Sequence, residues 1–370
     1  MSALRVGFDA SPLYGPRTGI GFAVEAMRGA LRERDDVELV EYVLSLRSRP
    51  APPVRRLPMP AVVAHHCWAR AKHPRMDRWL GDVDVVHGTN YVVPPSRFPR
   101  VVSVYDCWFL RHPDDANPAV ALAGKVLRRA VASGAVVHAS SHATAAAVRE
   151  SLAGADVHTV YLAPLPLTAP PPLPPIPELH GRPYVQAIGT LEQRKNLPRL
   201  VAAFGQVASL ERDLHLVLAG GDGDDREAIN EAVDALGEHA NRVMFAGRID
   251  GAVRSWLLHH ATVLAYPSLD EGFGFPLLDA MQAGVPIVAS SAGSIPEVAG
   301  QAALLSEATD VAGLADNLRI AVTSPSVRTH LVEAGTAQQA RFSWQQCAAE
   351  MAELYRRVAA SSGTGDSRQR

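Results

Sequence analysis

Short apolar runs alternate along the chain with longer segments in which apolar residues recur every three or four positions. The short runs predict β-strands, and the longer segments predict amphipathic helices. Because the strands are almost wholly apolar, we expect a parallel sheet that is buried on both faces by helices. In the first half the expected strands are 4–9, 37–44, 83–87, 101–106, 135–139 and 157–161, and the expected helices are 21–32, 119–133 and 141–152.

The alternation stops at a proline-rich segment, 163–177, and then begins again. Proline at this density excludes helix and sheet interiors, so the segment is expected to be an extended linker. Beyond it the expected strands are 184–188, 214–219, 243–245, 263–266 and 286–289, and the expected helices are 196–209, 226–236, 253–259, 275–283, 310–322, 327–340 and 344–358.

The two halves predict an α/β fold with two Rossmann-like domains. The expected boundaries are 1–165 for the N-terminal domain, 166–180 for the linker and 181–343 for the C-terminal domain. The helix at 344–360 is expected to pack back on the first domain, and the Ser/Gly-rich tail 361–370 is expected to be disordered. Ligands of such sheets bind at the carboxyl ends of the strands. Two sheets facing across a cleft would provide two such rims.

Composition narrows the class of protein. With 370 residues, 47% apolar and 20% charged, the chain is typical of a globular protein of two domains, and its net charge of −2 gives no reason to expect a nucleic-acid partner. Its three cysteines form no CxxC pair, so neither a disulfide framework nor a zinc site is expected. No apolar stretch is long enough to span a bilayer. A cytoplasmic protein, soluble or peripheral at the inner face of the membrane, is therefore expected.

A glycine-rich loop at 267–274 follows a predicted strand and precedes a predicted helix. Gly272 and Gly274 allow close backbone approach, and the N–H groups and dipole at a helix N-terminus favour an anion. Glu271 lies at the mouth of this helix and Asp279 about one turn inside it. Such carboxylates can accept hydrogen bonds from sugar hydroxyls. A buried helix with a capped N-terminus is the alternative interpretation.

A second loop, 189–196, follows the first strand after the linker and precedes another helix. Gly189 begins the loop, and Arg194 and Lys195 are adjacent near its end. Two cations and backbone N–H groups at a helix N-terminus indicate a diphosphate site. A solvated basic turn is the alternative.

Together these loops resemble the E-x7-E signature of retaining GT-B glycosyltransferases, the large family 4 group. The resemblance implies transfer of a hexose from GDP-mannose or a UDP-hexose to an acceptor hydroxyl, with retention of anomeric configuration, in glycan, polysaccharide or glycolipid synthesis. It implies that Glu271 contacts the hexose, that Asp279 holds the ribose, and that Lys195 with Arg194 neutralises the leaving diphosphate. Gly272, Phe273 and Gly274 would contact the donor. Asp279 stands where the family usually has Glu.

The resemblance extends to weaker loop positions. Gly19 and Gly21 would offer N–H groups to the donor phosphates, although a plain strand–helix turn is an equal alternative. Asp106, at a strand end, would orient the acceptor hydroxyl or cap a turn. His87, at a strand end, would form a hydrogen bond on the acceptor or donor side, or is a packed structural histidine, and Tyr105 would lie on the acceptor side. Arg248 would lie near the base of the nucleotide, and Glu297 near the nucleotide end or in a purely structural role.

Two charged segments allow more than one interpretation. The acidic loop 220–225 has the Asp-x-Asp spacing of a metal site, but acidic residues before a helix commonly serve as N-caps, so no metal or other cofactor is expected to be required. Residues 42–76 contain no Asp or Glu. The basic residues of this segment would contact an anionic membrane or a lipid-diphosphate acceptor, or form a solvated loop. They are Arg47, Arg49, Arg55, Arg56, Arg70, Lys72 and Arg75.

Two other functions remain open at this stage. One is a GT-B sugar-nucleotide epimerase or phosphorylase. The other is a nucleotide-sugar-binding subunit without catalysis, which the departures at Thr190, Tyr105 and Asp279 would allow. A nicotinamide oxidoreductase is disfavoured because neither half has G-x-G-x-x-G after its first strand.

Overall fold

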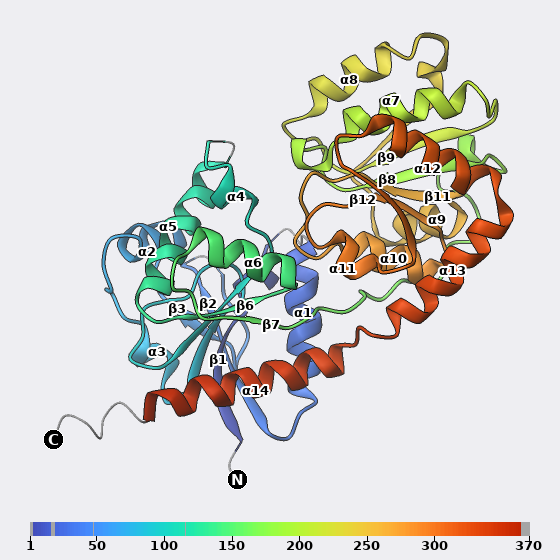
Figure 1. Cartoon of the computed structure of the whole chain (residues 1–370). Helices are drawn as coiled ribbons and strands as arrows, with labels where there is room; N and C mark the ends of the chain where they lie inside the picture. Colours follow the sequence, from blue (N-terminus) through green and yellow to red (C-terminus); the bar gives the residue numbers. More distant parts are fainter. Residues whose placement is uncertain (1–2, 16–18, 47, 115, 364–370) are drawn as a thin grey trace. The chain divides into compact units, whose positions relative to one another are not determined.

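The computed structural model describes residues 3–15, 19–46, 48–114 and 116–363, and the chain forms two compact units (Figure 1). The first unit extends to Ala163 and includes the chain again from Phe342, and the second is Pro164–Arg341. The proline-rich segment therefore belongs to the second unit, where Ser255 Oγ donates a hydrogen bond to the Thr168 carbonyl.

The first unit contains a sheet of seven parallel strands in the order β3-β2-β1-β4-β5-β6-β7. Helices α2, α5 and α6 cover one face, and α1 and α14 cover the other. The strands are β1 (Leu4–Asp9), β2 (Val37–Leu44), β3 (Arg55–Leu57), β4 (Val85–Gly88), β5 (Arg100–Val104), β6 (Val136–Ala139) and β7 (Val157–Thr159). The helices are η1 (Ser11–Leu13), α1 (Gly19–Arg32), α2 (Ala61–Trp68), α3 (Asp77–Leu80), α4 (Trp108–Arg111), α5 (Pro118–Ala132), α6 (His142–Ser151) and α14 (Trp344–Gly363).

A buried row of polar side chains joins α14 to the sheet. Tyr355 Oη lies 2.7 Å from His87 Nδ1, and His87 Nε2 lies 2.8 Å from Ser103 Oγ. Ser103 Oγ lies 2.8 Å from His138 Nδ1, and His138 Nε2 lies 3.0 Å from the Val160 carbonyl oxygen. Burial lowers the pKa of His138 to about 4, and burial together with His138 lowers the pKa of His87 well below its usual value. Both rings are therefore neutral in the folded protein at pH 7.

Acid is expected to weaken the fold through His138. Its folded pKa of about 4 lies below the unfolded value of 6.5, so its contribution is present above pH 6.5 and is lost as the pH falls towards 4. Between pH 7 and pH 5 this loss is about 2 kcal/mol. Burial raises the pKa of Asp9 to about 6, which acts in the opposite sense. The contribution is therefore measured as the difference in pH dependence of urea unfolding between the wild type and His138→Gln.

His66, exposed on α2, supplies the matched control. We expect His66→Gln to keep the pH dependence of the wild type. Equal pH dependence in the wild type and in His138→Gln would contradict the prediction.

The second unit contains a sheet of six parallel strands in the order β10-β9-β8-β11-β12-β13. The strand order reverses at β8, so the loops after β8 and β11 lie at a topological switch point, where α/β sheets bind ligands. The strands are β8 (Tyr184–Ile188), β9 (His215–Ala219), β10 (Val243–Gly247), β11 (Val263–Tyr266), β12 (Ile287–Ser290) and β13 (Ala303–Ser306). The helices are η2 (Pro177–Leu179), η3 (Gln193–Lys195), α7 (Leu197–Ala208), α8 (Arg226–Asp234), η4 (Gly237–Arg242), α9 (Gly251–His260), α10 (Phe275–Ala283), α11 (Ile295–Ala299), α12 (Val311–Thr323) and α13 (Pro325–Gln339).

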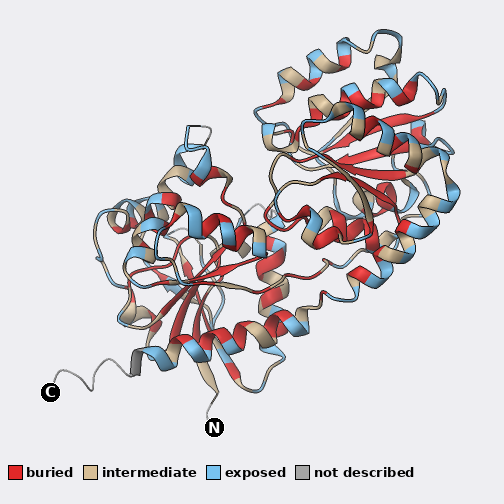
Figure 2. Ribbon diagram, viewed as in Figure 1, coloured by how far each residue is buried: buried red, intermediate tan, exposed pale blue. Residues whose placement is uncertain are grey.

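The strands of both sheets are largely buried, as expected from their apolar sequences (Figure 2). The hydrophobic pattern did not predict the short elements β3, α2, α3, α4, α11 and β13, because they span too few residues to show a period. The disordered tail expected at 361–370 is corrected in part, since α14 continues to Gly363. Residues 364–370 lie outside the described residues.

Candidate functional site

The loop after β8 is fastened to the loop after β11 by Asn196, which adopts a left-handed conformation with φ of 58°. Its side-chain Nδ2 donates hydrogen bonds to the carbonyl oxygens of Pro267, at 2.9 Å, and Ala308, at 2.7 Å. The backbone N–H of Leu269 donates to the Arg194 carbonyl oxygen at 2.8 Å. These bonds place the two loops that the sequence singled out side by side.

Glu271 is the centre of this junction. Its Oε2 accepts a hydrogen bond from Lys195 Nζ at 2.7 Å and from Tyr266 Oη at 2.5 Å, and lies 3.1 Å from Arg194 Nη1. Burial raises the pKa of Glu271, but Lys195 and Arg194 outweigh it and lower the pKa to about 2. The carboxylate is therefore ionised at every working pH. Sequence motifs indicated Glu271, Lys195 and Arg194 but not Tyr266, which is the last residue of the predicted strand 263–266.

Arg194 contacts more groups of the protein than the sequence predicted. Its Nη2 lies 2.8 Å from Glu192 Oε1, and its Nη1 donates to the Asp270 carbonyl oxygen at 3.1 Å. Two cations and two carboxylates thus meet in the cluster, so their charges balance. Lys195 contacts only one of the two carboxylates, which makes it the better candidate to turn towards a bound diphosphate.

Helix α10 begins beside Glu271. Its N-cap is Gly274, whose φ of 89° favours glycine, and no side chain caps the helix. Pro276 lies in the first turn, as expected. The loop after β12 packs against the same site: Ser294 N donates to the Glu271 carbonyl oxygen at 2.9 Å, and a Cβ at Gly293 would lie 2.4 Å from that oxygen. Gly272, Phe273 and Gly274 therefore connect Glu271 to an N-terminus that carries positive potential.

Asp279 lies on α10 with 2% of its surface exposed. Its Oδ2 forms an ion pair with Arg254 Nη2 from α9, a partner that the sequence analysis did not find. No partner is present for Oδ1 among the described residues. Burial raises the pKa of Asp279, although Arg254 acts to lower it. Asp279 therefore has one carboxylate oxygen bound within the protein and one available as an acceptor.

Removing Arg254 is expected to destabilise the second unit, because it leaves a buried carboxylate without its counter-charge. We expect Arg254→Met to lower the free energy of unfolding by about 3 kcal/mol at pH 7. The double variant Arg254→Met/Asp279→Asn should recover most of this loss. Urea unfolding provides the measurement.

The exposed pair Arg319–Asp316, 3.3 Å apart, provides the comparison. Because exposed ion pairs contribute little, Arg319→Met should cost less than about 1 kcal/mol. A cost for Arg254→Met that is equally small would show that the pair with Asp279 is not required for stability.

The loops after β8, β9 and β10 also meet. A Cβ at Gly220 would lie 1.8 Å from the Gly189 carbonyl oxygen, so only glycine fits there. The exposed Arg248 lies across the same loop, since a Cβ at Gly221 would be 3.3 Å from its Nη2. Glu297 lies in the first turn of α11, which follows β12, the strand next to β11 in the sheet.

The capping role expected for the acidic loop 220–225 is corrected. Asp225 occupies the N-cap position of α8, but its side chain makes no capping hydrogen bond. Asp222 Oδ1 instead lies 2.6 Å from Arg226 Nη1, and Asp224 Oδ1 accepts from Gln193 N at 3.0 Å. Asp224 therefore tethers the loop after β8. In the part of the chain that the structure describes, no group of three His, Cys, Asp or Glu residues is arranged to hold a metal.

The candidate residues of the first unit mainly make contacts within the protein. His87 is fully buried in the polar row below α14, and Tyr105, 7% exposed, donates from Oη to the Thr89 carbonyl oxygen at 2.9 Å. The acceptor-side contact expected of Tyr105 is corrected, because its side chain lies in the interior, and for His87 the structure shows the structural alternative. Asp106 accepts hydrogen bonds from Tyr91 Oη at 3.1 Å and from Trp108 N at 3.2 Å, which is the turn-stabilising alternative.

The glycines of the first loop lie at the start of α1. Gly19 is the first helical residue and Gly21 is buried in the first turn. Thr18, which precedes them in the motif, lies outside the described residues. The two glycines thus stand at a helix N-terminus, after the first strand of the sheet.

Residues 182–324 match the family model described as "Glycosyl transferases group 1". They include the whole junction of Lys195, Glu271 and Asp279. This segment is similar to the group 1 glycosyltransferases.

Curated relatives match different lengths of this chain. An O-antigen chain mannosyltransferase B of Escherichia coli is 29% identical over 175 residues, which are 47% of this chain and 45% of that protein. A phosphatidyl-myo-inositol mannosyltransferase of Mycobacterium leprae is 28% identical over 354 residues, 88% of this chain and 86% of that protein. The chain thus matches about half the length of the first relative and most of the second.

Solved structures match the fold of nearly the whole chain. Sucrose-phosphate synthase of Thermosynechococcus elongatus matches with a TM-score of 0.72 at 18% identity, covering 97% of this chain and 100% of that one. HepE of Anabaena, in complex with UDP and glucose, matches with a TM-score of 0.69 at 17% identity, covering 95% and 99%. The fold is therefore GT-B, built of two Rossmann-like domains with parallel sheets.

Proposed function

We propose that this protein is a hexosyltransferase that moves a hexose from a nucleotide-diphosphate sugar to an acceptor hydroxyl, with retention of anomeric configuration. The observation that carries the proposal is the contact of Lys195 with Glu271 beside the N-terminus of α10, within a segment similar to the group 1 glycosyltransferases. The names of the two curated relatives favour mannose, hence GDP-mannose, with a UDP-hexose as the alternative donor. Synthesis of a glycan, polysaccharide or glycolipid is the corresponding role.

Each group has a role in donor binding. The diphosphate would attract Lys195 Nζ away from Glu271 and lie against the N–H groups at the start of α10. The freed Glu271 carboxylate would accept hydrogen bonds from hexose hydroxyls. Oδ1 of Asp279 would accept a hydrogen bond from the ribose, and Arg248 would lie near the base. Because Lys195 and the helix supply positive potential at the leaving group, we propose no requirement for a metal or other cofactor.

Retention follows from attack on the face that the leaving group occupies. The bond from the anomeric carbon to the phosphate oxygen breaks as the bond from the acceptor oxygen forms on the same face. The acceptor proton passes to the departing phosphate oxygen, so the protein need not supply a base. The protein contributes placement of the sugar by Glu271 and stabilisation of the diphosphate charge by Lys195.

Thermal unfolding with UDP, GDP and their hexose conjugates tests the donor assignment. One nucleotide series should raise the melting temperature, since a ligand at a hundred times its Kd adds about 2.7 kcal/mol. Incubation with that sugar donor and NMR analysis of the products then separates the alternatives. Transfer with retention, or donor hydrolysis alone, supports a transferase; rearrangement of the sugar without an acceptor indicates an epimerase. Stabilisation without any turnover indicates a non-catalytic binding subunit.

A second proposal concerns membrane contact by the first unit. On α2, Val62 and Val63 are 65% and 50% exposed, and Arg70, Lys72 and Arg75 are exposed just after the helix. Apolar side chains beside basic ones are typical of peripheral binding to anionic lipid. No helix among the described residues is long and apolar enough to cross a bilayer.

Part of the basic segment is not available for this contact. Arg55 Nη1 donates to the Leu80 carbonyl, and Arg56 Nη1 donates to the Leu46 carbonyl oxygen at 3.4 Å. Arg49 is exposed on the same segment, and Arg47 lies outside the described residues.

Flotation with vesicles of anionic and of neutral lipid is expected to show binding to the anionic vesicles only. Binding should weaken as salt is raised, because the attraction is screened. The triple variant Arg70→Gln/Lys72→Gln/Arg75→Gln should lose it, and Arg319→Gln, an exposed change in the other unit, should not. Equal flotation of the two variants, or no flotation of the wild type, would contradict the membrane proposal.

A further inference from the structure

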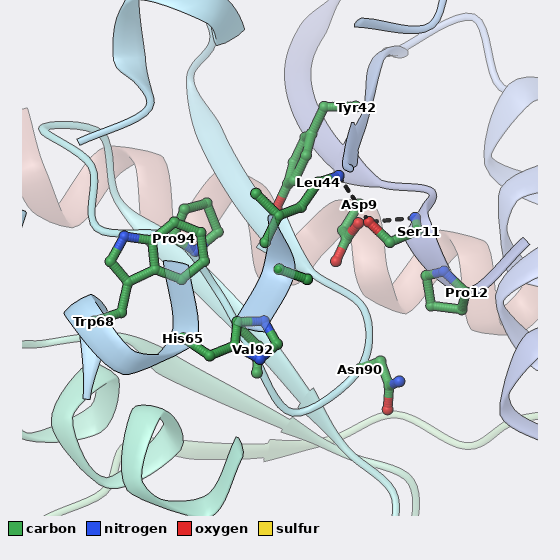
Figure 3. Close-up of a pocket in the computed structure, with 11 residues that line it drawn as sticks. Asp9, Ser11, Pro12, Tyr42, Leu44, His65, Trp68, Asn90, Val92 and Pro94 are labelled. Atoms are coloured by element: carbon green, nitrogen blue, oxygen red, sulfur yellow. Dashed lines mark hydrogen bonds between the residues drawn. The ribbon is translucent and has the colours of Figure 1, made fainter. Parts of the chain in front are cut away.

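A pocket of about 200 Å³ opens in the first unit at the carboxyl ends of β1, β2 and β4, and its lining includes none of the residues assigned to the donor (Figure 3). Asp9 and Ser11, from the end of β1, form one side of it, and His65 and Trp68 of α2 form the other. Helix α2 was not predicted from the hydrophobic pattern, so the pocket could not be anticipated from the sequence.

The polar groups of the pocket are mainly hydrogen-bond acceptors. Asp9 Oδ1 accepts from Ser11 N at 2.9 Å, and Ser11 Oγ accepts from Leu44 N at 3.0 Å. Thr89 Oγ1 donates to the Asp9 carbonyl oxygen at 2.7 Å and fixes the strand end. Asn90 Oδ1 is buried and has no partner among the described residues. The Asn90 oxygen can therefore accept a hydrogen bond from a ligand, and the Asp9 carboxylate, which has more acceptor sites than its bond from Ser11 uses, can accept another.

The charge of the lining excludes one class of ligand. No Lys or Arg is among the described residues that line the pocket. Burial raises the pKa of Asp9 to about 6, although hydrogen bonds from Ser11 lower it. At pH 7 the side chain is mostly ionised, so it would repel a phosphate or carboxylate on the ligand.

The rest of the wall is apolar and rigid. Trp68 is 2% exposed, and its Nε1 donates to the Pro74 carbonyl oxygen at 3.0 Å, which fixes the indole. Val92 and Pro94 complete this side. An apolar wall opposite hydrogen-bond acceptors suits a ring that has C–H groups on its faces and hydroxyls around its edge.

We propose that this pocket binds one hydroxyl-rich six-membered ring of the acceptor that carries no anionic group, a monosaccharide or cyclitol unit, with Asp9 and Asn90 accepting hydrogen bonds from its hydroxyls. The volume is below the 300–1,000 Å³, roughly, of sites for drug-sized ligands, which limits the occupant to about one ring. This assignment deepens the proposed function and rests on it for the role of the ring as acceptor. Binding of the ring itself can be measured without turnover.

Ligand-detected NMR titration with myo-inositol, mannose, glucosamine and mannose 6-phosphate tests the pocket. The rings without a phosphate should bind more tightly than mannose 6-phosphate, because the ionised Asp9 repels an anion. Asp9→Asn keeps the shape of the side chain and should weaken binding of the neutral ring about tenfold, since a hydrogen bond to a charged group is lost. Asp82→Asn, the same change at a carboxylate that is 91% exposed, should leave binding unchanged.

A second variant fills the pocket instead of changing its charge. Ala61→Phe, at the first residue of α2, should abolish binding of the ring while far-UV circular dichroism stays as in the wild type. Failure of every neutral ring to bind the wild type, tighter binding of the phosphorylated ring, or equal binding by Asp9→Asn would each overturn the assignment.

Donor binding separates this inference from the proposed function. Stabilisation by the nucleotide should be the same in the wild type, Asp9→Asn and Ala61→Phe, because the residues given a donor role in the proposed function, Lys195 and Glu271 among them, belong to the other unit. Nucleotide stabilisation without ring binding overturns the pocket alone. Ring binding that Asp9→Asn weakens, without any nucleotide stabilisation, overturns the transferase proposal and leaves the ring site standing.

Discussion

Lys195→Ala is expected to lower the rate of sugar transfer by about a hundredfold to a thousandfold, the cost of removing one preorganised group that stabilises developing charge. Lys195 Nζ lies 2.7 Å from Glu271 Oε2 and 3.1 Å from Tyr266 Oη, which hold it beside the start of α10. Arg194 is held by Glu192 and is poorly placed to replace it. Turnover is measured with the donor that the thermal screen identifies.

Lys125→Ala, at an exposed position on α5, is the matched control and should keep wild-type turnover. Circular dichroism shows whether both variants keep the fold of the wild type. Folded Lys195→Ala protein with a rate within about threefold of the wild type would remove Lys195 from the mechanism.

Glu271→Gln is expected to lower turnover by about a hundredfold while leaving the binding of the free nucleotide intact. The substitution keeps the shape of the side chain but removes the negative charge that would orient the hexose hydroxyls. UDP or GDP without a sugar does not extend to this position in the proposed mode, so its thermal stabilisation should persist. Because the pKa of Glu271 is about 2, the wild-type rate should show no loss from protonation of this group above pH 4.

Glu231→Gln, an exposed change on α8, provides the comparison for this second variant. If Glu271→Gln loses nucleotide binding as completely as it loses turnover, Glu271 acts by holding the loop rather than by contacting the sugar. Full turnover in Glu271→Gln would exclude both roles.

The ion pairs of the proposed donor site explain why Lys195→Ala and Glu271→Gln should do more than remove a salt bridge. In the described structure Lys195 and Arg194 both face Glu271, and Glu192 neutralises the second cation. A donor diphosphate would take Lys195 as its counter-ion and leave Glu271 free to bind the sugar. The same ion pair thus keeps both groups in place until a ligand separates them.

Much of the fold was predictable because its signals are local. Apolar runs such as Tyr184–Ile188 and Val263–Tyr266 appear as strands at the predicted positions, since a strand buried on both faces needs a continuous apolar stretch. The helix Phe275–Ala283 begins after Gly274 and ends before Gly284, both in left-handed conformations that glycine favours. Short elements such as Arg55–Leu57 carried no period and were missed.

The candidate site divides in the same way. The sequence alone determined the strands, the glycine loops and the proximity of Lys195 to a helix mouth that carries Glu271, because parallel strands bring their carboxyl ends to one edge. Only the tertiary structure decided that Arg254 neutralises Asp279, that His87 and Tyr105 face inward, and that Asp9 meets Trp68 around a pocket. These outcomes depend on which side chains packing brings together from distant elements, and no local pattern records that choice.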